Sequence, residues 1–164
     1  RYVQESVRMK TFNQYITELF EKPAKWNEFG KWNSRREASF TIDEMDYEIL
    51  VLVNRPGPDS SYIPVTLTVE FSLSGEGGVK KGVKTSITQT GNASKVLSTV
   101  IDYLKYLMKD IKPEKIVFTA REQSRQKLYS AIAKRMKKLG LVKSIEHKGG
   151  LFRLFTTNHG GKKG

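Results

Sequence analysis

The segment in which strand-like periodicity gives way to helical periodicity is the first place where the chain could bind a ligand. Residues 86–100, SITQTGNASKVLSTV, pass through Gly91 into a helical pattern. The first-turn amides of a helix have no intrahelical partners and can hold a phosphate. Gly91 allows close approach of the backbone, Asn92 or Ser94 can cap the helix, and Lys95 adds a positive charge. The junction is a candidate anion site, although an ordinary turn with a helix cap has the same pattern.

Two further residues have side chains that could move protons. Glu70 lies on the polar face of an alternating segment, residues 63–74, and its carboxylate could deprotonate an amine directly or through water. Tyr129 follows the apolar position Leu128 in a helical segment, and its phenol could protonate a leaving thiolate. A solvated carboxylate on a sheet face and an aromatic ring in the core are the alternative interpretations.

Hydrophobic periodicity predicts the elements that carry these residues. Alternation with a period of two predicts strands at 63–74 and 83–90, joined as an antiparallel hairpin across a glycine-rich connection. Helical spacing predicts a long helix between Gly91 and Pro113. The remaining predicted elements are a strand at 115–120, a helix at 124–139 and a closing hairpin formed by 142–147 and 151–157.

The first third of the chain is less regular. Residues 9–23 place Phe12, Ile16, Leu19 and Phe20 on one helical stripe, which predicts an amphipathic helix ended by Pro23. Residues 25–37 are interpreted as a loop or a short irregular crossing whose aromatic side chains, Trp26, Phe29 and Trp32, cover a core edge. Residues 40–54 contain two extended pieces, and the near-continuous apolar run of the second is typical of a strand covered on both faces.

These elements predict an α/β (α+β) fold, a mixed and mostly antiparallel sheet flanked by helices. The length of 164 residues fits one domain. We expect an N-terminal arm and amphipathic helix at 1–24, a single domain at 25–157 and a flexible basic tail at 158–164.

Composition excludes several kinds of chemistry. The chain has no cysteine, so disulfides, thiolate metal sites and cysteine nucleophiles are excluded. Two histidines, His147 and His159, make a metal site improbable, and we predict none. No apolar run approaches the roughly 18 residues of a membrane span, and no signal peptide is visible, so a cytoplasmic location is expected. The net charge of +12 would attract nucleic acid, acidic proteins or an anionic cofactor, and a solvated basic surface explains it equally well.

Taken together, the two junctions resemble the GNAT acetyltransferase superfamily over roughly residues 63–155. The family has a loop of the form Q/R-x-x-G-x-G/A before a long helix, and this chain has Gln89, Thr90, Gly91, Asn92 and Ala93, one residue shorter. A later helix with a Leu-Tyr pair matches Leu128-Tyr129, and Leu139-Gly140-Leu141 matches its end. The resemblance implies that residues 89–95 bind acetyl-CoA, that Glu70 is the general base and that Tyr129 is the general acid.

A second resemblance concerns the biological context. Residues 9–23, MKTFNQYITELFEKP, look like the N-termini of internal and capsid-targeted proteins of large tailed phages. The segments TGNASKVLSTVIDYL and SRQKLYSAIAKRM look like those of small phage proteins of GNAT-like shape. This implies a bacteriophage protein in the host cytoplasm or the virion interior, with the first helix as an address or docking element.

Three functions therefore compete. The first is an acetyl-CoA-dependent N-acetyltransferase that acts on an unknown amine. The second is a non-catalytic basic module that contacts nucleic acid or an acidic host protein, with affinity that falls steeply with salt. Its candidate contact residues are cations in or near the second helix: Arg121, Arg125, Lys127, Lys134, Arg135 and Lys138. The third is a virion structural protein that associates through Phe12, Ile16 and Phe20.

Overall fold

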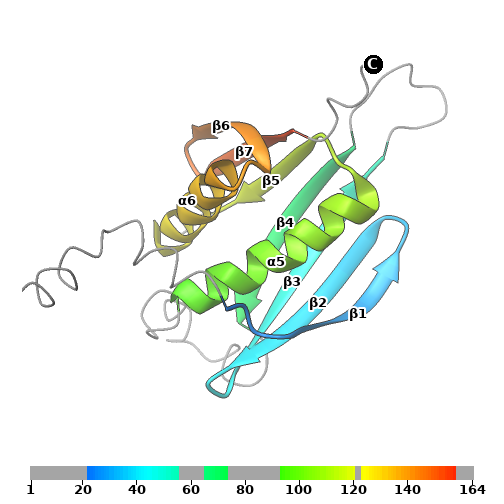
Figure 1. Ribbon diagram of the computed structural model, residues 1–164, viewed down its shortest axis with the longest axis vertical. Coiled ribbons are helices and arrows are strands. Elements are labelled where there is room, and N and C mark those ends of the chain that lie inside the picture. Colours follow the sequence, from blue (N-terminus) through cyan, green and yellow to red (C-terminus); the bar gives the residue numbers. More distant parts are fainter. Residues whose placement is uncertain (1–21, 56–64, 74–92, 121–122, 158–164) are drawn as a thin grey trace, which may run out of the picture.

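The computed structural model describes residues 22–55, 65–73, 93–120 and 123–157 (Figure 1). Within these ranges the chain forms one seven-stranded sheet and two helices, an α+β fold. The strands are β1 (Trp26–Trp32), β2 (Arg35–Ile42), β3 (Met45–Asn54), β4 (Thr66–Leu73), β5 (Lys115–Thr119), β6 (Val142–Lys148) and β7 (Leu151–Thr156). The helices are α5 (Ala93–Ile111) and α6 (Gln123–Lys138). The predicted strand at 83–90, the first helix and the basic tail lie outside the described residues.

The strand order is β1-β2-β3-β4-β5-β7-β6, and every neighbouring pair is antiparallel except β4 and β5. Parallel neighbours need a crossover connection, and the segment between β4 and β5 contains α5. The predicted mixed and mostly antiparallel sheet is therefore confirmed.

Both helices cover the same face of the sheet. α5 crosses β2, β3 and β4, and α6 lies beside β5 (Figure 1). Side chains that point to this face are buried, as Val51, Val69 and Phe118 show with 0 % exposure. The two described helices therefore flank the sheet on one of its faces.

The expectation that β3 is covered on both faces is wrong. Leu52 points away from the helices and is 37 % exposed. Leu50 points the same way, and it is half-buried because it lies between Glu37 of β2 and Glu70 of β4. Leucines on an open face shielded by neighbouring side chains give the same continuous apolar run as a strand buried on both sides.

The interpretation of residues 25–37 as a loop is wrong. They form β1, a turn and the start of β2, and β1 pairs with β2 across a register shift between Glu28 and Gly30. This irregularity breaks the period-two pattern that would have identified the strand. Trp26 is partly buried, whereas Phe29 and Trp32 are 50 % and 57 % exposed and do not cover a core edge.

A partly buried ion network fastens the β1–β2 hairpin to α5. Arg36 is 4 % exposed, and its Nε and Nη1 donate hydrogen bonds to Glu28 and Asp110 at 2.9 and 2.8 Å. The Tyr103 hydroxyl donates to Glu28 at 2.6 Å. Burial favours the neutral carboxyl, but the hydrogen bonds from Arg36 and Tyr103 outweigh it and lower the pKa of Glu28. The network therefore couples the sheet edge to the helix through ionised groups.

Aromatic packing holds α6 on the sheet. Tyr129 stacks on Phe118 of β5 with a centroid distance of 4.7 Å and contacts Phe152 of β7 edge-on at 6.4 Å. Leu128, Ile132 and Met136 extend this buried stripe at helical spacing. Neither described helix is long and apolar enough to span a membrane.

Candidate active-site cleft

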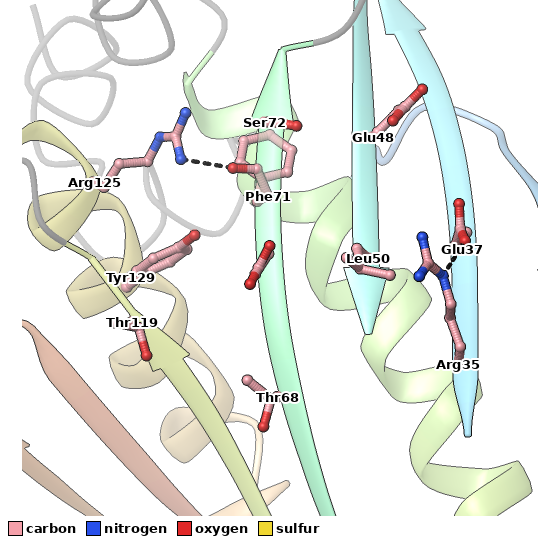
Figure 2. Close-up of a pocket in the computed structure, with 11 residues that line it drawn as sticks. Arg35, Glu37, Glu48, Leu50, Thr68, Phe71, Ser72, Thr119, Arg125 and Tyr129 are labelled. Atoms are coloured by element: carbon pink, nitrogen blue, oxygen red, sulfur yellow. Dashed lines mark hydrogen bonds and ion pairs between the residues drawn. The ribbon is translucent and has the colours of Figure 1, made fainter. Parts of the chain in front are cut away.

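A cavity of about 490 Å³ opens where β4 and β5 separate (Figure 2). Its walls come from β2, β3, β4, β5 and α6. The lining residues are Arg35, Glu37, Glu48, Leu50, Thr68, Glu70, Phe71, Ser72, Thr119, Arg125 and Tyr129. Most of these side chains are polar, so the cavity suits a polar or charged ligand.

Strand alternation places the carboxylates of the cavity. Glu37, Leu50 and Glu70 are register partners on three adjacent strands, so they form one row on the face that the described helices leave uncovered. Glu48 lies two residues from Leu50 along β3, on the same face. Glu37 forms an ion pair with Arg35, seen as a dashed line in Figure 2. Three carboxylates thus border one cavity, and Arg35 compensates one of them.

The separation of β4 from β5 creates the inner end of the cavity. β4 pairs with β3 along its whole length, from Thr66 to Leu73. It pairs with β5 only from Thr66 to Val69, where the partner is Phe118. β5 ends one residue later at Thr119, which lines the cavity. Beyond Val69, therefore, the edge of β4 that faces β5 has no partner strand among the residues that the structure describes.

Tyr129 closes the gap from the helix side. Its side chain is 1 % exposed, yet it contributes to the cavity wall. Burial raises the pKa of the phenol, the nearby charge of Glu70 adds to this, and the charge of Arg125 opposes it. A raised pKa keeps the hydroxyl protonated near neutral pH, which is the form that can donate a proton.

Arg125 bridges α6 and β4 across the same gap. Its Nη1 donates a hydrogen bond of 2.6 Å to the carbonyl oxygen of Phe71 (Figure 2). Its Nε is buried and finds no acceptor among the described residues. The sequence grouped Arg125 with the cations that would contact nucleic acid, whereas the structure places it in the cleft. The i, i+4 spacing of Arg125 and Tyr129 is a signal that identifies a shared helix face.

The structure brings Glu70 and Tyr129, the two predicted proton-transfer residues, into the wall of one cavity. Of the seven predicted cofactor-binding residues, the structure describes three. Ala93, Ser94 and Lys95 form the first turn of α5 and do not line this cavity. Gln89, Thr90, Gly91 and Asn92 lie outside the described residues.

The other predicted contact residues are not equivalent. Lys127, Lys134 and Lys138 are exposed on α6, and Arg135 is half-buried beside Pro23 and Leu139. Arg121 lies outside the described residues. A shallow groove of about 450 Å³ runs between α6 and β6 and is lined by Gln126, Lys127, Ser130, Ala131, Lys134 and His147. Lys127 and Lys134 line this groove, and the described part of α6 contains no carboxylate, so this surface is basic.

Eight of the eleven cleft residues were not predicted as site residues, namely Arg35, Glu37, Glu48, Leu50, Thr68, Phe71, Ser72 and Thr119. All eight lie on strands, and the sequence of one strand does not reveal which side chains of the other strands lie beside it. Among the described residues no group of three or more histidine, aspartate or glutamate side chains is arranged to hold a metal ion. No family model matches the chain, and no curated protein matches it in sequence.

Proposed function

We propose that the protein is a GNAT-like N-acyltransferase that transfers an acetyl group from acetyl-CoA to an amine in the β4–β5 cleft. The observation that carries this proposal is the meeting of Glu70 and Tyr129 in one cavity, at the point where β4 and β5 separate. The single parallel strand pair with α5 in its crossover also agrees with the order of elements on which the GNAT resemblance rests.

The cleft residues suit the two proton transfers of this reaction. Acetyl-CoA supplies a thioester, and the amine nitrogen forms a bond to its carbonyl carbon as the carbon–sulfur bond breaks. Glu70 accepts the proton that the amine loses, directly or through water. Tyr129 donates its phenolic proton to the leaving sulfur, a role that its raised pKa supports.

The charges of the cavity favour a cationic acceptor. Glu37, Glu48 and Glu70 supply three carboxylates, and Arg35 pairs with Glu37. An ammonium group that enters the cavity meets Glu48 or Glu70, either of which stabilises it before deprotonation. A cavity of about 490 Å³ accommodates a small polyamine.

An acetylation assay tests the proposal. The protein is incubated with acetyl-CoA and a panel of amines that contains spermidine, a neutral aromatic amine and free lysine, and thiol release is followed. Glu70→Gln is expected to lower the rate at least about 100-fold while acetyl-CoA affinity changes little. The exposed carboxylate Glu146, which is 61 % exposed, provides the matched control Glu146→Gln. Absence of thiol release with every amine, together with absence of acetyl-CoA binding, contradicts the proposal.

A second function is favoured by the basic surface of α6. We propose as the alternative that Lys127, Lys134 and Lys138 contact the phosphates of a nucleic acid. The observation behind it is a helix with six cations, no carboxylates and a groove along its exposed side. Gel-shift titrations against duplex DNA at several salt concentrations test it, since phosphate contacts give a steep loss of affinity with salt. Location in a host cytoplasm or a virion interior suits this alternative and remains a proposal.

A further inference from the structure

The groove between α6 and β6 contains an aromatic ring that is held in a fixed orientation. His147 lines this groove and is exposed, and its ring stacks on Phe152 with a centroid distance of 3.9 Å and an interplanar angle of 11°. Its Nε2 donates a hydrogen bond of 2.8 Å to the carbonyl oxygen of Gly149, in the turn between β6 and β7. Two contacts therefore fix the plane of a solvent-exposed ring.

The ring rests on the core of the protein. Phe152 is 1 % exposed and contacts Tyr129 of α6 edge-on, so the surface beneath His147 is closely packed. His147 and Phe152 are register partners on β6 and β7, the two strands beside α6 in Figure 1. Because Phe152 covers one face of an exposed ring, the opposite face is open among the residues that the structure describes. This open face is a preformed platform on which a planar group can stack.

The charges beside this platform suit phosphates. Lys127 and Lys134 line the groove and are exposed, and their spacing of seven residues puts them on the same side of α6, about 10 Å apart along its axis. Ser130 and Ala131, whose side chains are short, line the groove between them. Two cations thus flank a stretch of small residues across the groove from His147. Phosphates can be neutralised on both sides of a planar group that stacks on the ring.

Planar groups and phosphates occur together in nucleic acids. In a duplex the bases stack on one another and proteins reach only their edges, whereas a single strand can turn the faces of its bases outward. Proteins that bind single strands stack such bases on aromatic side chains, beside cations that follow the backbone. The groove volume of about 450 Å³ lies within the usual range of ligand sites, so the groove can receive a base.

We propose that this groove binds single-stranded nucleic acid, with a base stacked on His147 and the flanking phosphates on Lys127 and Lys134. The inference rests on the alternative function given above, contact of α6 with nucleic acid, and it names the form of nucleic acid and the residue that selects it. His147 distinguishes a single strand from a duplex, and the two lysines add affinity that does not depend on the base.

Fluorescence anisotropy titrations of the full chain test the proposal. Three labelled DNA probes of about 12 nucleotides are compared at low salt: a mixed-sequence single strand, the same strand annealed to its complement, and a single strand of equal length without bases. The wild-type protein should bind the mixed-sequence strand at least about fivefold more tightly than the baseless strand, and more tightly than the duplex. This comparison does not depend on the folding of a variant.

Two variants assign the preference to His147. His147→Ala removes the ring and should weaken binding of the mixed-sequence strand at least about fivefold, with unchanged binding of the baseless strand. His147→Phe keeps a ring without the hydrogen bond to Gly149 and should bind both strands within about twofold of the wild type. Ser144→Ala is the matched control, since Ser144 is exposed on the same strand and does not line the groove.

Each other result counts against the proposal. Equal wild-type affinity for the mixed-sequence and baseless strands, or an equal effect of His147→Ala on both, refutes stacking and leaves phosphate contact by α6 intact. Tighter binding of the duplex refutes the choice of a single strand. Equally tight binding of a polyglutamate peptide of matched charge shows recognition of negative charge alone and refutes the assignment to nucleic acid. If no probe binds at low salt, stacking and the alternative function both fail, and the proposed acyltransfer is unaffected.

Discussion

Replacement of Glu28 by glutamine should uncouple the β1–β2 hairpin from α5. The Glu28 carboxylate accepts hydrogen bonds from Arg36 at 2.9 and 3.3 Å, from Tyr103 at 2.6 Å and from Tyr106 at 3.3 Å. Glutamine retains one acceptor oxygen and turns an amide group with two donors toward the others. It also leaves Arg36, which is 4 % exposed, with Asp110 as its remaining carboxylate partner in this network.

The size of the effect follows from these contacts. A hydrogen bond to a charged group contributes about 1.5–3 kcal/mol, and breaking a buried ion pair by removal of one partner costs about 3–5 kcal/mol. We expect Glu28→Gln to lower the free energy of unfolding by about 3 kcal/mol, the lower end of that range, because Asp110 still compensates Arg36. For a chain of this length the melting temperature should fall by about 6–12 °C.

The effect should depend on pH with a definite sign. The pKa of Glu28 is lowered from 4.5, so its ionised form stabilises the folded protein above that value. The contribution disappears as the pH falls through the lower folded-state pKa. The stability gap between wild type and Glu28→Gln should therefore be constant near neutral pH and should narrow in acid, below about pH 4.5.

Urea unfolding followed by circular dichroism at several pH values measures this gap. Glu146→Gln is the control, because the Glu146–Arg153 pair is exposed and separated by 3.5 Å, so it should change stability by less than about 1 kcal/mol. Equal stabilities of Glu28→Gln and Glu146→Gln would refute the reasoning. A gap that persists unchanged at low pH would show that the ionised carboxylate is not its source.

Three other substitutions test separate parts of the molecule. Tyr129→Phe should lower kcat about 100-fold or more, and an unchanged rate contradicts its role. Because the phenol pKa is raised, loss of the phenolic proton should lower the wild-type rate only in strong alkali, and this alkaline decline should be absent from the variant's pH profile. Replacing both Lys127 and Lys134 with glutamine should make the log–log salt dependence of any DNA binding shallower by about two, and an identical slope would exclude this face. Gly150→Ala should cost about 1–3 kcal/mol in urea unfolding, because its new Cβ would lie 1.9 Å from the Ala120 carbonyl oxygen, and a fully stable variant would contradict that clash.

The elements that carry the candidate site could be predicted where the local pattern is strong. The alternation in residues 66–73 placed Glu70 on a polar strand face, and helical spacing placed Leu128 and Tyr129 in α6. The β1 strand was missed because its bulge interrupts the alternation. An irregular edge strand depends on its partner for its conformation, so its own sequence is a weak guide.

The composition of the cleft could not be predicted, because it depends on register between strands. Glu37 and Glu70 are 33 positions apart in the sequence, and only the pairing of β2, β3 and β4 puts them in one row beside Leu50. Arg125 is a different case. Its spacing from Tyr129 is typical of a shared helix face. In a helix with six cations, however, the charge of Arg125 suggested a contact with nucleic acid and not a place in the cleft.

The distribution of charge gives the two proposed ligands different places on the molecule. The chain carries a net charge of +12, whereas the cavity wall has three carboxylates and two guanidiniums, a local excess of one negative charge. The net positive charge of the protein attracts an acyl donor with phosphates. A cationic amine is stabilised only inside the cleft, where the carboxylates lie. Arg125 lies where the two regions meet, between the basic helix α6 and the carboxylate row of the sheet. In the proposed reaction Glu48 and Glu70 are left to the cationic acceptor, so that each substrate finds the charge opposite to its own.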